Sequence, residues 1–406
     1  MKKIHYSWVI CGAATLALFA TVGLLSNAFS VFLPYVIKQN NFTYTQGSSI
    51  IMARHIATVL SMLSIGWVYN KLSLRQGMTM AISLAAVTFF LYATATSFLA
   101  YCAASLLSGV AYTLGGMIPA SVLLMQWFKG HRALAMGLCS AGSGVAAIIA
   151  PPALTKIIEN FSLTTGFFFT VGIESFCAVA LFLLVRDTPE QLGLEPYGAA
   201  LPENASPRKL REAKEVFLTK RQRNWILAAM FLIGAGINNA FGHLAVLYKT
   251  EGYDSMVVAM GLSFVGLALT VGKCLCGQIM DWIGTYKTNY IFCGITVIGF
   301  FFYGLASTHL YILFYSGMLL AGVGISIITV GMSLWAADLS SAATYSTTIK
   351  DFQTCSMVGT LLFSLVPGIF ADVTGSYTIA YWVMGLLVGV SLLIIQRTYR
   401  EVGKDR

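Results

Sequence analysis

Residues 8–37 read WVICGAATLALFATVGLLSNAFSVFLPYVI, and this stretch contains no charged residue. A helix needs about 20 consecutive apolar residues to cross the hydrocarbon core of a bilayer. The stretch is longer than that, and it is also much longer than the apolar region of a signal peptide. We therefore interpret it as an uncleaved membrane span, and it predicts a helical membrane protein.

Apolar stretches of this kind recur along the whole chain with short polar breaks between them. Six of them are followed by one long polar break and then by six more. The sequence therefore predicts an all-α membrane protein with twelve transmembrane helices in two six-helix bundles. The predicted spans are Trp8–Ile37, Ser49–Tyr69, Met78–Ser97, Tyr101–Trp127, Ala133–Ile157, Thr165–Val185, Trp225–Tyr248, Met256–Met280, Tyr290–Ala306, Leu310–Ala336, Thr347–Ala371 and Tyr377–Ile395.

The long polar break divides the predicted architecture into three parts. Residues 1–186 form an N-terminal six-helix bundle, residues 187–224 form a cytoplasmic linker loop, and residues 225–406 form a C-terminal six-helix bundle with a short tail. The linker is rich in basic residues and proline, which predicts a loop with a short amphipathic piece and not a separate domain.

The composition excludes a soluble protein. Of the 406 residues, 57% are hydrophobic and only 10% are charged, and the mean hydropathy is +0.76. A soluble domain carries about 25% charged residues. The sequence contains no phosphate-binding glycine loop, zinc-protease motif or nucleophile elbow, and its eight cysteines lack metal-ligand spacing. We therefore expect no enzyme activity, no cofactor and no metal site.

The basic residues predict the orientation in the membrane. An even number of spans places both termini on one side. If that side is the cytoplasm, 19 of the 25 lysine and arginine residues lie inside, and only Lys38, Lys156 and Lys249 lie outside. The positive-inside rule therefore predicts a multi-pass cell-membrane protein with both termini cytoplasmic. The net charge of +9 is then mainly a topology signal and gives no case for nucleic acid.

The two halves of the chain also resemble each other in sequence. Gly66 and Asn70 close the second span, and Gly277 and Asp281 close the eighth, at an offset of 211 residues. Asn27 in the first span and Asn238 in the seventh share that offset. These matches predict two pseudo-symmetric six-helix repeats, which commonly place a solute site at their interface near the middle of the bilayer.

The loop after the eighth span reads Gly277-x-x-x-Asp281-x-x-Gly284-x-x-Lys287. This pattern closely resembles the signature that major facilitator superfamily transporters carry between the second and third helices of each half. The first-half copy is degraded and reads Gly66, Asn70 in place of Asp, Ser73 in place of Gly, and Arg75. The pattern would serve close helix approach at the glycine and place a carboxylate at a helix end.

Within that superfamily the chain resembles the monocarboxylate and oxalate–formate antiporter branch. The strings that carry this resemblance are Asn27–Pro34 (NAFSVFLP), Trp127–Gly137 (WFKGHRALAMG), Gly142-Ser-Gly144 with Pro151-Pro152, and Arg186–Gly198 (RDTPEQLGLEPYG). The resemblance covers nearly the whole chain. It implies the major facilitator fold and transport of a small organic anion by alternating access.

Lys273 is the first candidate for binding that anion. A charged residue at the bilayer centre costs about 2.5–3.5 kcal/mol on insertion scales, so each needs a reason. Lys273 lies eight residues before Asp281, roughly 12 Å from the cytoplasmic end of its span, on the same helix face as Gly277. Carriers of the resembled branch have an arginine at this position. Lysine keeps the charge without the bidentate fork. The alternative role is a salt bridge that locks helices.

Lys350 and Arg54 are the other cations inside predicted spans. If the span of Lys350 begins near Asp338, this lysine lies roughly 18 Å deep, close to the depth of Lys273. We predict a substrate contact, and the alternative is a structural pair with Asp351 or Asp338. Arg54 lies roughly 24 Å from the cytoplasmic end of the second span. We predict that it is either an anion contact of the first half or part of an outer gate.

Proton coupling has several candidate residues. Monocarboxylate carriers have an aspartate four residues before the cation of the eighth span, but Leu269 occupies that position here, which excludes coupling through it. Glu174 in the sixth span is a candidate proton acceptor and the natural internal partner for the cations. The remaining coupling candidates are Asp351, His55 and His243, and anion exchange without protons is the alternative.

Uncharged polar residues complete the predicted site. We predict Asn27, Asn238, His243 and Tyr112 as further substrate contacts. A lone membrane histidine more often hydrogen-bonds another helix than binds a ligand, so both interpretations of His243 stay open.

The predicted function is secondary active transport of a small mono- or dicarboxylate, as proton symport or anion exchange. The expected partners are this anion, a proton or counter-anion, and the lipid bilayer, and we expect a monomer. One alternative is an exporter of drugs or other hydrophobic compounds on the same fold, with the interior cations paired to Glu174 and Asp351. Another is a transporter-like receptor that moves nothing.

Overall fold

The computed structural model describes residues 5–198, 218–341 and 344–403. These residues are almost entirely helical and contain no β-strand, apart from one isolated bridge between Phe128 and Tyr197. Eleven helical stretches in this part of the chain are long and apolar enough to cross a membrane. A further helix, α12 (Thr285–Tyr303), begins with a polar turn and lies where the ninth span is predicted. The predicted all-α membrane architecture is confirmed.

The chain divides into two compact units, which are described separately. Unit 1 comprises Met1–Phe32 and Ala53–Lys209, and unit 2 comprises Leu33–Met52 and Leu210–Arg406. Residues 33–52 therefore pack with the second half of the chain, although the sequence places them inside the first bundle. The helix α3 (Tyr44–Lys71) crosses from one unit to the other.

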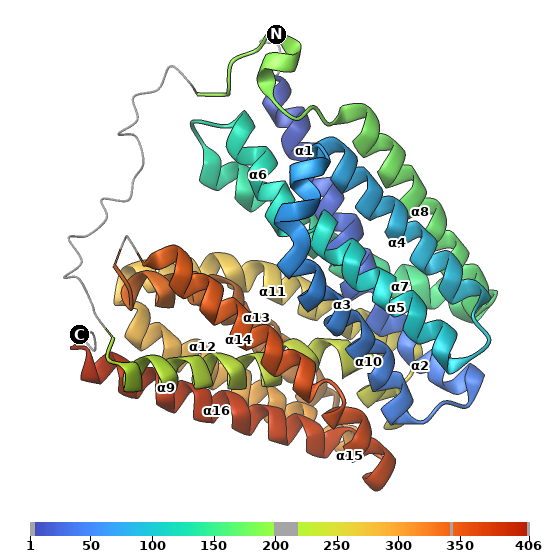
Figure 1. The fold of residues 1–406 in the computed structure, drawn as a ribbon. Coiled ribbons are helices and arrows are strands. Elements are labelled where there is room, and N and C mark those ends of the chain that lie inside the picture. The colour runs from blue at the N-terminus through green and yellow to red at the C-terminus, as the bar shows by residue number, and fades with distance from the viewer. Residues whose placement is uncertain (1–4, 199–217, 342–343, 404–406) are drawn as a thin grey trace. The chain divides into compact units, whose positions relative to one another are not determined.

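Unit 1 is built from the first six predicted spans. Within it α4 packs along α8 and α5, while α1 and η1 pack against α7 (Figure 1). Its buried apolar core joins side chains of α1, α4, α6, α7 and α8. Its elements, besides α3, are α1 (Tyr6–Leu18), η1 (Phe19–Asn27), α2 (Phe29–Asn40, which ends in unit 2), α4 (Leu74–Thr94), α5 (Phe98–Gly115), α6 (Met117–Trp127), α7 (Arg132–Asn160), α8 (Leu163–Leu184) and η2 (Pro189–Leu192).

Unit 2 contains the last six predicted spans. Within it α13 packs against α11 and α12 (Figure 1), and α16 packs against both α9 and α12. Its elements, besides α12, are α9 (Lys220–Ile233), η3 (Gly234–Asn238), α10 (Asn239–Thr250), α11 (Ser255–Ile283), η4 (Ala306–Thr308), α13 (Tyr311–Asp338), α14 (Tyr345–Phe363), α15 (Val366–Thr374) and α16 (Thr378–Glu401).

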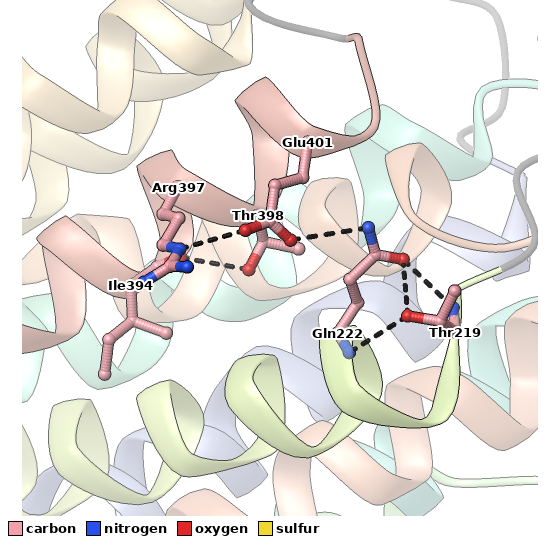
Figure 2. Close-up of polar contacts among 6 residues, drawn as sticks. All are labelled: Thr219, Gln222, Ile394, Arg397, Thr398 and Glu401. Atoms are coloured by element: carbon pink, nitrogen blue, oxygen red, sulfur yellow. Dashed lines mark hydrogen bonds and ion pairs between the residues drawn. The ribbon is translucent and has the colours of Figure 1, made fainter.

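Polar contacts join the beginning of α9 to the end of α16, as Figure 2 shows. Thr219 and Gln222 form a reciprocal capping box at the start of α9. The Gln222 Nε2 donates to Glu401 Oε2 at 3.5 Å, and the Arg397 Nε donates to Glu401 Oε1 at 2.9 Å. A capping box is a strong start signal for a helix, which explains why α9 begins before the predicted span start at Trp225.

Two spans contain wide π-helical turns at equivalent positions. The segment η1 ends at Asn27 and η3 ends at Asn238. A Cβ added at Gly23 would collide with Ala146 of α7, and one added at Gly234 would collide with Ser356 of α14. Each glycine therefore allows a wide turn to pack closely against the fifth span of its own half. The sequence predicts continuous helices here, and the wide turns are a correction to it.

The polar break between the two halves is described only at its edges. Its predicted amphipathic piece, with most of its basic residues, lies outside the described residues. The preceding segment folds back onto α6, because the Tyr197 N–H donates to the Trp127 carbonyl at 2.9 Å and the Lys129 N–H donates to the Tyr197 carbonyl at 2.9 Å. The string Arg186–Gly198 thus closes one end of unit 1.

Candidate substrate site

Arg54 is the buried cation of unit 1. It lies ten residues into α3, about 15 Å from the start of that helix at 1.5 Å per residue. Only 9% of its surface is exposed, and its Nη1 donates to the Ser26 carbonyl at 3.3 Å. Among the described residues no carboxylate forms an ion pair with it. A guanidinium has five N–H donors, and this bond uses one of them.

The acceptor for Arg54 comes from the wide turn of the first span. In η1 the Ala28 N–H donates to the Gly23 carbonyl, five residues back, at 2.9 Å. A π-helical turn shifts the backbone pairing by one residue and is frequent at functional sites. The Ser26 carbonyl lies in this turn and faces Arg54 of α3.

Two tyrosines lie near this arginine, and one asparagine follows the residue that provides its backbone acceptor. Tyr92 of α4 and Tyr112 of α5 are its electrostatic neighbours. The Tyr92 hydroxyl is 2.6 Å from Ser105 Oγ, which fixes its position. Asn27 directly follows Ser26, and its side-chain amide has no hydrogen bond within the described part of the chain.

Unit 1 therefore brings Tyr112 near Arg54, and it places Asn27 directly after the residue whose carbonyl Arg54 binds. The approach of α3 and α5 makes this possible, because a Cβ added at Gly109 would collide with the Arg54 carbonyl. Tyr92 belongs to the same group and was missed by the sequence analysis. The sequence does not indicate this role for Tyr92, because a tyrosine near the end of a span is ordinarily an interface residue. Only the folded structure places it near Arg54.

Lys273 is a partly buried cation of unit 2. It lies ten residues before the end of α11, about 15 Å from that end, and is partly buried. Gly272 and Cys276 on the adjoining face are buried, and a Cβ at Gly272 would meet the backbone of Val323 in α13. No carboxylate of the described residues forms an ion pair with Lys273. The predicted alternative, a salt bridge that locks helices, is therefore not observed.

The predicted depth of Lys350 is wrong. The helix α13 ends at Asp338 and α14 begins at Tyr345, so Lys350 is five residues into a new helix and about 8 Å from its start. Its side chain is exposed. The prediction counted from Asp338 as if the helix were continuous.

Asp351 has a partner that the sequence did not suggest. The Arg223 Nη2 of α9 lies 2.7 Å from its Oδ2. The pairs proposed for it, with Lys350 or another cation inside the membrane, are not observed in the described residues. Because Asp351 and Arg223 lie near the starts of α14 and α9, this ion pair joins two helix ends.

His243 and Asn238 are engaged within unit 2. The His243 Nδ1 is 3.0 Å from the Asn239 carbonyl, which only accepts, so Nδ1 carries the proton in this pairing. In neutral histidine Nε2 then accepts from the Ser48 hydroxyl, 2.9 Å away. The Asn238 amide donates to Thr360 Oγ1 at 2.9 Å. Both contacts connect helices, which favours the hydrogen-bonding interpretation of His243.

Glu174 lies fully buried in α8. Both of its carboxyl oxygens are without a hydrogen-bond partner, and no cation of the described residues pairs with it. Its helix face also carries Cys177 and Ala178, which belong to the apolar core of unit 1. The ion pair suggested between Glu174 and an interior cation is not observed. His55, the other coupling candidate in this half, is partly buried beside Arg54.

The signature loops of the two halves differ in backbone conformation. Gly284 has φ +85°, a conformation that favours glycine, and it caps α12. At the equivalent point Ser73 has extended backbone and caps α4 with Gln76 in a capping box, so no glycine is needed there.

Within each unit, no described residue closely approaches the first signature glycine. A Cβ added at Gly66 or Gly277 would meet no atom within 4 Å. Asn70, Asp281 and Lys287 are exposed at the helix ends.

In the first-half loop, a carboxylate from elsewhere in the chain binds the backbone of Arg75. The Arg75 N–H donates to Asp187 Oδ1 at 2.8 Å, and its Nε donates to the Phe182 carbonyl at 2.7 Å. A carboxylate near a helix N-terminus is favourable. Asp187, beyond the sixth span, therefore serves the start of α4.

The helices and their repeat, with cations held inside the membrane-spanning part, define a polytopic helical transporter. The chain belongs to the major facilitator superfamily, whose family model matches residues 15–350. Solved structures agree on the fold. The nucleoside transporter NupG superposes with a TM-score of 0.76 over 98% of this chain and 99% of that one, at 12% identity. A bacterial homologue of the human lysosomal transporter Spinster gives 0.73 over 100% and 99%, at 14% identity.

The curated relatives include monocarboxylate transporters, efflux proteins and a protein named only as a transporter of this superfamily. Human monocarboxylate transporter 10 is 26% identical over 70% of this chain and 58% of its own length. The aspyridones efflux protein apdF of Emericella nidulans is 26% identical over 69% and 55%. The transporter hasB of Aspergillus fumigatus is 26% identical over 48% and 44%. The chain thus spans about half the length of the curated relatives that it matches.

Proposed function

We propose that this chain is a secondary active transporter of a small mono- or dicarboxylate that works by alternating access. The observation that carries the proposal is the environment of Arg54. Its guanidinium is buried at membrane depth, bound to one backbone carbonyl and paired with no carboxylate of the described residues. Burying an unpaired charge is costly. A substrate carboxylate would supply the missing partner, with Asn27 and Tyr112 as hydrogen-bonding neighbours.

Lys273 supports the same proposal from unit 2. It too is a partly buried cation without an ion pair in the described chain. Closing a transporter around an unpaired cation is unfavourable, and a bound anion removes that cost. This difference in free energy links binding to movement, because a ligand shifts a conformational equilibrium only through its differential affinity for the two states.

The coupling mechanism is proton symport or anion exchange. Glu174 is the proposed proton carrier for symport, because its carboxyl group is buried without donor or cation in the described residues. Asp351 is less suited to that role, since it is held by Arg223.

Export of a hydrophobic compound is the second candidate function. It is favoured by the relatives named as efflux proteins, apdF among them. An exporter of uncharged compounds would gain nothing from unpaired interior cations, and we expect it to pair them with Glu174 and Asp351. Within unit 1 Glu174 is not paired with Arg54, and within unit 2 Asp351 is held by Arg223 and not by Lys273, which favours the anion carrier.

We further propose two six-helix halves, residues 1–186 and 225–406, joined by the cytoplasmic segment 187–224. The distribution of basic residues supports a cell-membrane location with both termini in the cytoplasm. The labelling experiment of the next subsection also tests this orientation.

Uptake by the purified protein in proteoliposomes tests the proposed substrate class. Labelled lactate, formate and oxalate are offered with and without an inward-directed pH gradient, next to an uncharged hydrophobic dye. We expect saturable uptake of at least one carboxylate, accelerated by the gradient for symport or by internal carboxylate for exchange. Transport of the dye with no carboxylate uptake would favour the exporter.

A further inference from the structure

Two backbone N–H groups at the amino-terminal end of α3 have no hydrogen-bond acceptor within that helix. Thr43 and Gln46 form a local cap, in which the Thr43 hydroxyl accepts from the Gln46 N–H at 3.1 Å. The Gly47 N–H donates to the Thr43 carbonyl at 3.0 Å as the first bond of the helix. The first N–H groups of a helix have no intrahelical partner. The N–H groups of Tyr44 and Thr45 therefore need an acceptor from another part of the chain.

Asp372 of α15 supplies that acceptor for both groups. Its Oδ1 accepts from the Tyr44 N–H at 2.8 Å, and its Oδ2 accepts from the Thr45 N–H at 2.9 Å. A carboxylate at this place also interacts favourably with the positive end of the helix dipole. The side chain lies at an exposed rim, so water can replace it when the two elements separate.

Close packing and a buried hydrogen bond lie behind this rim. One turn before Asp372, a Cβ added at Gly368 would come within 2.5 Å of both Ser48 Oγ and the Tyr44 carbonyl. The Ser48 hydroxyl is fully buried and bonded to His243 Nε2 at 2.9 Å. Tyr377 contacts the rings of both Tyr44 and His243. These contacts place the start of α3 in unit 2, while the rest of the helix belongs to unit 1.

We propose that Asp372 and the Ser48–His243 bond form a latch that holds residues 44–52 against the second half of the chain. Under the orientation proposed above, this end faces outside the cell. Since α3 continues into unit 1, movement of the two halves during alternating access must open the latch once per cycle. The proposal rests on the transport activity proposed above but not on its substrate.

A second aspartate at the same end of unit 2 offers a matched control. Asp254 caps α11, which begins in the second half and stays there. Its Oδ1 alone accepts from both Met256 N–H and Val257 N–H, at 2.9 and 3.2 Å. Asparagine at 254 can therefore keep both bonds with its single oxygen. Asparagine at 372 must lose one, because each oxygen of Asp372 serves a different N–H.

The test is the labelling rate of a reporter cysteine behind the latch. Ile51 is 2% exposed and lies against Gly242 of α10. Intact cells carrying Ile51→Cys are treated with a membrane-impermeant maleimide, and the signal of the same chain without the reporter is subtracted. We expect Asp372→Asn to raise the rate about threefold or more, and Asp254→Asn to leave it unchanged.

Gly368→Ala is a second test of the latch, for use if Asp372→Asn fails to fold. Its methyl group would push the start of α3 away without changing any charge, so it should also accelerate labelling. An unchanged rate in both latch variants, or an equal rise in Asp254→Asn, would overturn the latch. A reporter labelled only after permeabilisation would overturn the outward orientation on which it depends. No substrate is needed, so these outcomes are separate from any failure of carboxylate transport.

Discussion

At the scale of single residues, the pairing of charges inside the membrane separates the proposed binding residues from structural ones. Arg54 and Lys273 lie about 15 Å from helix ends without ion pairs in the described residues, whereas Asp351 is tied to Arg223 across two helix starts. A side chain held by a protein partner is poorly placed to exchange that partner for a substrate. The burial and pairing of each cation, and not its presence in an apolar stretch, determine its proposed role.

The two lysines of unit 2 should therefore respond differently to loss of charge. Lys273→Gln should lower the initial rate of carboxylate uptake roughly tenfold or more, the effect of losing one charged hydrogen bond. Lys350→Gln should change it by less than about twofold, because an exposed cation contributes little. Uptake in proteoliposomes with equal amounts of folded protein measures both. Equal losses in the two variants would contradict this assignment.

At the scale of elements, the wide turns η1 and η3 give the first span of each half its shape. Gly23 and Gly234 occupy the same place in the two halves, and each brings its wide turn against the fifth span of that half. The turns also provide carbonyl groups for contacts outside the helix, such as the bonds from Arg54 to Ser26 and from Thr360 to Gly234. The internal repeat is thus visible in packing as well as in sequence.

A methyl group at Gly234 should disrupt this packing. The added Cβ would lie 2.6 Å from the Ser356 carbonyl carbon, which is backbone and cannot rotate away. Overpacking of this kind costs about 1–3 kcal/mol, so Gly234→Ala should lower the thermal unfolding temperature in detergent. Gly12→Ala in α1 is the control, because its Cβ would meet nothing within 4 Å. An unfolding temperature as high in Gly234→Ala as in the control would contradict this prediction, because it would show that the close approach of the two helices does not limit stability.

The sequence predicted the elements better than their internal geometry. Apolar length and basic loops identify spans because the bilayer imposes both. Nothing local distinguishes a π-helical turn from an α-helical one, so η1 and η3 were missed. The depth of Lys350 was misjudged because the turn before Tyr345 follows a run that also reads as helix. Arg54, Asn27 and Tyr112 were each identified, but Tyr92 was not, because only the fold brings this residue of α4 near Arg54.

At the scale of the whole molecule, membership in the superfamily defines a transporter, and the residues of this chain suggest its cargo. The relatives include both monocarboxylate transporters and efflux proteins, so similarity alone does not choose between these cargoes. The proposal of a carboxylate rests on cations in both units that form no ion pair among the described residues. The proposed latch at Asp372 adds a way to hold one end of α3 until the cycle opens it.

The most direct test of this account is the initial rate of carboxylate uptake by Arg54→Gln in proteoliposomes. Arg397→Gln is the matched control, since Arg397 is an exposed arginine paired with Glu401 within one helix. We predict a loss of roughly tenfold or more for Arg54→Gln, with the control close to the unaltered protein. Uptake by folded Arg54→Gln at the rate of the control would contradict the claim that a buried, unpaired arginine binds the transported anion.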